Sequence, residues 1–153
     1  MNPSRKLDYF LHQIFSRTRV LIFTKLSDKK HHTMKTVIIG ASNNPSRYAF
    51  MAAEMLTEYG HEFVPVSNKK GDVLGKTILS IQERPEITGV DTVTLYLGPQ
   101  HQPAWYDYIL SLKPKRIIFN PGTENDEFER LARQRGIEPI EACTLVMLRT
   151  GQY

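Results

Sequence analysis

Short apolar runs and helically spaced apolar residues alternate along the chain from about residue 35 onward. The run Val37-Ile38-Ile39 is typical of a strand buried on both faces of a sheet. Between such runs, apolar residues recur three and four positions apart, as on the buried side of a helix. The predicted strands are residues 36–39, 62–66, 92–97, 116–119 and 137–140, and the predicted helices are residues 45–59, 76–82, 103–112, 124–135 and 142–148.

This alternation predicts an α/β fold: a Rossmann-like, doubly wound, parallel five-stranded sheet between two layers of helices, three layers in all. In such a sheet, ligands bind beyond the carboxyl ends of the strands, where the strand order reverses. We therefore expect four glycine- and proline-rich loops to converge on one cleft. These loops are Gly40–Ser42, Ser67–Gly71, Leu97–Pro99 and Asn120–Gly122.

Two helix starts carry recognisable capping signals. Asn43 or Asn44 is predicted to cap the first helix, with Pro45 at its first position, where a missing N–H has no consequence. Thr123 and Asp126 have the spacing of a capping box for the helix at 124–135.

The basic charge of the chain belongs to its first 33 residues. They hold seven Lys and Arg against two Asp and Glu, a net charge of +5, whereas the other 120 residues hold 13 against 14, a net charge of −1. We predict that residues 1–33 are a disordered basic leader or lie upstream of a true start at Met34. A basic tail or targeting segment is the alternative. A nucleic-acid function cannot be argued from a pI set by this segment.

The remaining composition favours an ordinary globular domain of residues 34–153. No apolar stretch approaches the roughly 20 residues that a membrane span needs. The single cysteine, Cys143, excludes internal disulfides, and a reducing, cytoplasmic location is the simplest interpretation. Without such an apolar stretch, no membrane partner is expected. No nucleic-acid partner is expected either, since Trp105, Tyr106 and Tyr108 have no basic residues interleaved.

The run from Lys35 to Pro45 predicts a phosphate-binding corner, in which a buried strand breaks at a glycine and a helix follows. Gly40 would let the backbone approach a phosphate, with backbone N–H groups of Ala41–Asn43 as donors. Ser42 and Asn43 can add side-chain hydrogen bonds, and Arg47 follows near the helix start. The glycine spacing of the usual NAD motif is absent. A plain strand-to-helix turn is the alternative.

The end of the second strand separates classes of nucleotide. NAD-binding folds place an acidic residue there, which hydrogen-bonds the ribose hydroxyl. This chain has Ser67-Asn68-Lys69-Lys70 instead, which favours a phosphate-bearing ribose, as in NADP or coenzyme A. Two solvated lysines in a loop are the alternative.

No catalytic set or metal-ligand spacing is evident. His101 lies near the predicted cleft without an obvious orienting carboxylate, and Cys143 precedes an apolar run as a small buried residue would. Cys143 could instead lie near a bound thiol and form a mixed disulfide. We therefore expect binding rather than catalysis.

From about residue 35 to residue 153 the chain resembles the CoA-binding domain proteins, small relatives of the CoA-binding domain of the succinyl-CoA synthetase alpha subunit. The resemblance rests on the runs VIIGASNNP (37–45), VPVSNKK (64–70), LGKT (74–77), NPGTEN (120–125) and EACTLV (141–146). It implies a Rossmann-like fold that holds CoA, with the pyrophosphate at Gly40–Asn43. The adenosine would lie near Ser67–Lys70 and Leu97–Pro99. The ligating domains of the synthetase are not part of the resemblance.

The sequence thus predicts non-catalytic binding of coenzyme A or an acyl-CoA by residues 34–153. An NAD(P)-binding redox sensor or reductase is one alternative, and an interaction module without a ligand is another. The predicted cofactor-binding residues are Gly40, Ala41, Ser42, Asn43, Arg47, Ser67, Asn68, Lys69, Lys70, Leu97, Pro99, Asn120, Pro121 and Gly122.

Overall fold

The computed structural model describes residues 33–153, so the predicted leader lies outside the described residues except for Thr33. The strands are β1 (Lys35–Ile39), β2 (Glu62–Ser67), β3 (Asp72–Val73), β4 (Lys76–Thr77), β5 (Leu79–Ser80), β6 (Thr92–Leu95), β7 (Arg116–Phe119) and β8 (Glu138–Glu141). The α-helices are α2 (Tyr48–Glu58), α3 (Tyr106–Ser111), α4 (Asp126–Gln134) and α5 (Thr144–Thr150). Three short 3₁₀ turns are η1 (Ile81–Glu83), η2 (Pro99–His101) and η3 (Pro103–Trp105). None of the helices in this part of the chain is long and apolar enough to cross a membrane.

The main sheet contains six strands in the order β5-β2-β1-β6-β7-β8, and every pairing is parallel. The order reverses between β1 and β6, which makes the gap beyond their carboxyl ends the expected ligand position. The prediction of five strands was wrong by one. The additional strand, β5, is two residues long and pairs only with the end of β2, where a short helix was predicted. A strand this short has no readable periodicity.

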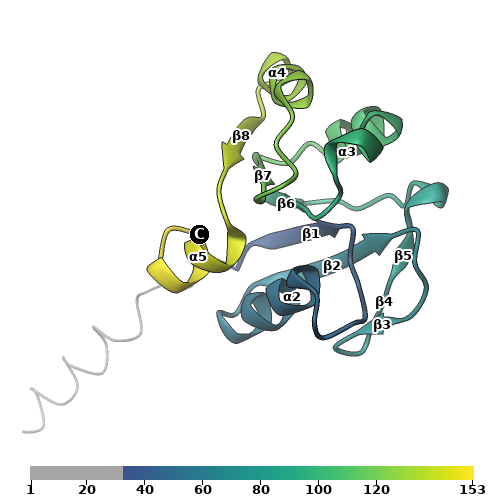
Figure 1. Ribbon diagram of the computed structural model, residues 1–153, viewed down its shortest axis with the longest axis vertical. Helices are drawn as coiled ribbons and strands as arrows, with labels where there is room; N and C mark the ends of the chain where they lie inside the picture. Colours follow the sequence, from purple (N-terminus) through teal and green to yellow (C-terminus); the bar gives the residue numbers. More distant parts are fainter. Residues whose placement is uncertain (1–32) are drawn as a thin grey trace, which may run out of the picture. The chain divides into compact units, whose positions relative to one another are not determined.

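Helices cover both faces of this sheet (Figure 1). Consecutive residues of β1 point to opposite faces, as a strand requires. Ile38 packs with Leu56 of α2 and Leu148 of α5 in one core, whereas Val37 and Ile39 belong to the other core. That second core includes residues of α3 and α4. The three-layer, doubly wound arrangement predicted from the apolar pattern is therefore confirmed.

Both predicted helix starts differ from the structure. Helix α2 begins at Tyr48, and its N-cap is Arg47 in an extended conformation. Asn44 instead closes a local turn, because its Oδ1 accepts a hydrogen bond from Ser46 N–H at 2.9 Å. In α4 the N-cap is Asn125, whose side chain accepts from Phe128 N–H at 3.1 Å.

Candidate functional site

The turn after β1 is held between the two neighbouring strands. Gly40 has a φ of +87°, and a Cβ at this position would lie 2.6 Å from the carbonyl oxygen of Tyr96, just beyond β6. The N–H groups of Gly40 and Ala41 both donate to the carbonyl oxygen of Val66 in β2, at 3.0 and 3.2 Å. Only glycine satisfies both the conformation and the close approach.

These hydrogen bonds change which backbone donors are available to a ligand. The expectation that the Ala41 N–H binds a phosphate is not supported, because Val66 already accepts its hydrogen bond. The N–H groups of Ser42 and Asn43 have no acceptor within residues 33–153. The Ser42 side chain is 4% exposed, and its Oγ accepts from Asn44 N–H at 3.2 Å. The turn therefore presents two adjacent backbone donors on a rigid support.

The amino end of α2 adds positive potential beside this turn. Its N-cap, Arg47, forms no side-chain capping hydrogen bond, and the first turn of this fully described helix has no acidic residue. Unsatisfied N–H groups at a helix start carry a partial positive charge and favour an anion. The guanidinium of Arg47 supplies a full charge at the same position.

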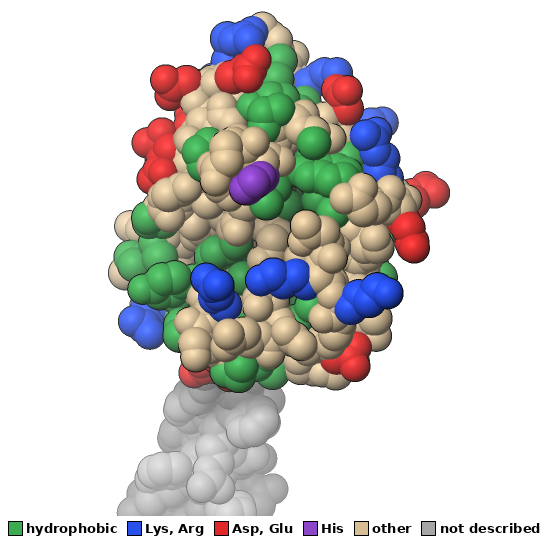
Figure 2. All heavy atoms as spheres, turned by 45° about the vertical axis from the view of Figure 1, so that its right-hand side comes forward, with side chains coloured by type: hydrophobic (Ala, Val, Ile, Leu, Met, Phe, Trp, Pro, Cys, Tyr) green, Lys and Arg blue, Asp and Glu red, His purple; other side chains and the backbone are tan. Residues whose placement is uncertain are grey.

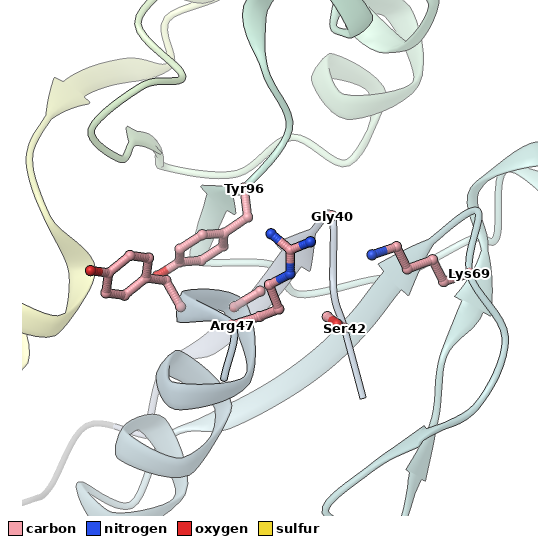
Figure 3. Close-up of a pocket in the computed structure, with 7 residues that line it drawn as sticks. Gly40, Ser42, Arg47, Lys69 and Tyr96 are labelled. Carbon is pink, nitrogen blue, oxygen red and sulfur yellow. The ribbon is translucent and has the colours of Figure 1, made fainter. Parts of the chain in front are cut away.

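A cavity of about 260 Å³ opens at this corner. Figure 3 shows Arg47 and Lys69 reaching toward each other from opposite sides of the segment that carries Gly40 and Ser42. The described lining of this cavity contains two cations, Arg47 and Lys69, and no carboxylate. The lining residues are Gly40, Ser42, Arg47, Tyr48, Ala49, Lys69 and Tyr96. Such a set is suited to an anionic ligand.

Lys69 is positioned by the loop that follows β2. The buried Ser67 accepts a hydrogen bond from Lys69 N–H through its Oγ at 3.2 Å. Gly71 lies against the Asn43 side chain, since a Cβ there would be 2.6 Å from Asn43 Nδ2. The loops after β1 and β2 are thus brought together as predicted. Asn68 and Lys70 are exposed and do not line this cavity.

Figure 2 brings forward the side toward which β1 and β2 run in Figure 1, and basic side chains lie in a row across the lower part of this face. The carboxyl edge of this half of the sheet therefore carries positive charge, although residues 34–153 have a slight excess of acidic residues. The local charge, rather than the net charge, describes the ligand that this edge can attract.

A second cavity of about 250 Å³ adjoins the first, and the two share Tyr48 and Tyr96 in their linings. The remaining lining residues are Asn120, Pro121, Cys143 and Leu145. The described lining of this second cavity contains no Lys, Arg, His, Asp or Glu. Burial raises the pKa of the Tyr96 hydroxyl, so it stays neutral at physiological pH. One cavity is cationic and the other largely apolar.

Asn120 is the hub of a buried hydrogen-bond network. Its Nδ2 donates to Thr94 Oγ1 at 2.7 Å and to the Leu95 carbonyl at 2.9 Å, and its Oδ1 accepts from Thr144 N–H at 2.9 Å. These bonds join the ends of β6 and β7 to the start of α5. The predicted contact of Asn120 with a ligand stays a prediction, and its amide already has protein partners.

The other predicted site residues lie outside the two cavities. Leu97 packs against a hydrophobic core, and Pro99 is exposed at the start of η2. Gly122 is exposed, and its N–H donates to Glu124 Oε2 at 2.7 Å. Their roles in binding stay predictions.

Sequence reasoning missed three residues of the first cavity: Tyr48, Ala49 and Tyr96. Tyr48 and Ala49 follow Arg47 directly, so a correct helix start would have included them. Tyr96 was assigned to a strand that in fact ends at Leu95. Only the placement of β6 beside β1 brings Tyr96 to Gly40.

Comparison with known proteins identifies relatives for nearly all of the described part. A family model described as a CoA binding domain matches residues 34–149. A crystal structure of a protein described only as uncharacterized is 60% identical; the match covers 79% of this chain and 98% of that chain, with a TM-score of 0.77. No curated protein is significantly similar to this chain.

More distant solved structures share the fold. A conserved hypothetical protein from Pyrococcus furiosus is 26% identical, with a TM-score of 0.63; the match covers 74% of this chain and 97% of that chain. A protein from Thermus thermophilus is 20% identical, with a TM-score of 0.68, over 85% of this chain and 98% of that chain. The match with the Thermus protein supports the fold alone.

Proposed function

The chain belongs to the CoA-binding domain family, and from this premise we propose that it binds coenzyme A, free or acylated, at the carboxyl edge of its sheet without transforming it. One observation carries the proposal. The cavity at the β1 turn combines two cations, an uncapped helix start and two available N–H donors, with no carboxylate in its described lining.

The pyrophosphate is the part of CoA that this corner suits best. The N–H groups of Ser42 and Asn43 would donate to its oxygens, and Gly40 holds the turn that carries them close to Tyr96. Arg47 would pair with the same charge from the other side, since its guanidinium presents several donors in a fixed plane. Ligand affinity would therefore depend on charge and on the shape of this turn.

Lys69 is the residue that we assign to the ribose phosphate. It lines the cavity, whereas Lys70 does not. No acidic residue stands at the end of β2, where a fold that binds NAD holds the ribose hydroxyl. A lysine at this place selects a ribose that carries a phosphate.

The second cavity offers space for the uncharged arm of the ligand. It begins at Tyr48 and Tyr96, which it shares with the cationic cavity, and continues past Cys143 and Leu145. A ligand that is anionic at one end and uncharged at the other matches this pair of cavities. Cys143 would contact this arm without forming a bond to it.

Lys69→Ala should weaken CoA binding by about tenfold or more, because a hydrogen bond to a charged group contributes about 1.5–3 kcal/mol. Dephospho-CoA, which lacks the ribose phosphate, should bind the variant and the unmodified protein with nearly the same affinity. Calorimetric titration of the full chain with both ligands measures this difference.

Lys70→Ala is the matched control, since it removes the same charge one position away and outside the cavity lining. It should weaken CoA binding much less. An equal loss of affinity for CoA and dephospho-CoA in Lys69→Ala would contradict the assignment of Lys69 to the ribose phosphate.

The same titration tests the two rival functions. NADP also carries a phosphate on its ribose, so Lys69 by itself does not separate it from CoA. Tight binding of NADP without CoA would favour a redox sensor or reductase. Absence of any affinity for CoA, dephospho-CoA, NAD and NADP would favour an interaction module.

A further inference from the structure

Three carboxylates meet beside β8, the edge strand of the sheet, outside the linings of both cavities. Asp126 and Glu129 lie one turn apart on α4, and Glu141 is the last residue of the edge strand β8. One carboxylate oxygen from each lies within 4.8 Å of the others. Like charges this close repel unless something neutralises them.

Glu129 is the buried member of this carboxylate trio, at 6% exposure. Its Oε2 pairs with Arg133 Nη2 at 3.0 Å. Its Oε1 is buried and has no hydrogen-bond partner among residues 33–153. A buried carboxylate oxygen without a donor is unfavourable, and in native proteins such an atom commonly contacts a water or an ion. This orphaned oxygen, Glu129 Oε1, is available to a ligand.

The surrounding charges add to the imbalance. The trio brings three carboxylates to one place. Arg133 is the cation that pairs with Glu129. The trio therefore has more negative charge than this one ion pair neutralises.

We propose that Asp126, Glu129 and Glu141 form a binding site for a hard divalent cation of the Ca²⁺, Mg²⁺ or Mn²⁺ class. Carboxylate oxygens are the ligands that these ions prefer, and oxygens this close together can reach one ion. Water completes the coordination on the exposed side, where Asp126 and Glu141 lie. The orphaned Oε1 then gains a partner.

The bound cation joins the first turns of α4 to the end of β8. β8 is an edge strand, and β7 is its only partner in the described sheet. The cation therefore ties β8 to α4 as well. The expected consequence is greater stability of the fold. The site is separate from the proposed CoA cavity, so its test does not depend on CoA binding.

Thermal unfolding of the full chain, first treated with a chelator, tests the site. Titration with CaCl₂, MgCl₂ or MnCl₂ against KCl at matched ionic strength should raise Tm by roughly 5–10 °C when one of these cations reaches about 100 times its Kd. Glu141 is exposed, so the Glu141→Gln variant should fold normally. Its affinity for the cation should be lower by at least about tenfold.

Glu127→Gln is the control, because Glu127 is an exposed acid in the same helical turn but outside the trio. It should leave the cation response unchanged. A Tm that responds to none of the three cations beyond the KCl effect overturns the proposal. So does an equal response to the cation in Glu141→Gln and in the unmodified protein.

Discussion

Replacement of Gly40 by alanine is expected to lower the free energy of unfolding by about 2–5 kcal/mol, the sum of backbone strain and overpacking. The strain arises because φ is +87°, and the overpacking arises because the new Cβ would lie 2.6 Å from the Tyr96 carbonyl oxygen. Since that oxygen belongs to the backbone, the turn must move away from β6. Chemical denaturation measures the loss of stability.

The same movement should displace the donors that we assign to the pyrophosphate. Gly40→Ala should therefore lower CoA affinity by at least about tenfold in the protein that remains folded, which corresponds to about 1.4 kcal/mol. Calorimetric titration at a temperature well below the transition measures this separately from stability.

Gly60→Ala provides the control for Gly40→Ala. Gly60 also has a positive φ, +76°, but a Cβ there would have no atom within 4 Å. It should cost only about 1–2 kcal/mol of backbone strain and leave CoA affinity unchanged. If both substitutions destabilised the protein equally, the close approach of Tyr96 to Gly40 would have no energetic role.

Asn120→Ala is expected to lower the free energy of unfolding by about 3–5 kcal/mol, because each buried group left without a partner costs about 1–3 kcal/mol. The substitution removes the partner of Leu95 C=O and of Thr144 N–H, and one partner of Thr94 Oγ1. Asn120 is 3% exposed, so water cannot replace these bonds without a rearrangement. Chemical denaturation measures the change.

Asn44→Ala is a suitable comparison, because it makes the same chemical change at an exposed residue with one side-chain hydrogen bond to Ser46. Its cost should be within about 1 kcal/mol. If Asn120→Ala also lowered the free energy of unfolding by only about 1 kcal/mol, the hydrogen bonds of Asn120 to β6 and α5 would not stabilise the fold. Asn120→Asp offers a second variant, which keeps an acceptor for Thr144 but places an oxygen against the Leu95 carbonyl.

Local features explain what was predicted well. The strand at 116–119 matches β7 residue for residue, because three consecutive buried apolar positions, Ile117–Phe119, end at a polar turn. Gly60 and Gly136 follow the ends of α2 and α4 with positive φ, as helix-ending glycines do. The prediction of a tight turn at Gly40 required only its place directly after an apolar run.

Capping shows where local signals were ambiguous. Asn43, Asn44, Thr123 and Asn125 can each accept a hydrogen bond from a nearby N–H group, and sequence spacing does not rank them. The structure selects Asn125 for α4, because Thr123 donates to the Asn120 carbonyl instead. Near α2, Asn44 closes a turn of its own, and the helix starts at Tyr48.

The sequence by itself determined the class of the fold, the loops at the carboxyl edge and the basic, acid-poor character of the turn after β2, because these follow from residues close together in the chain. Only the tertiary structure decided that Tyr96 meets Gly40, that Lys69 rather than Lys70 enters the cavity, and that Glu141 joins Asp126 and Glu129. Those contacts depend on strand order and on how each loop turns, and both are set by packing between segments far apart in the sequence.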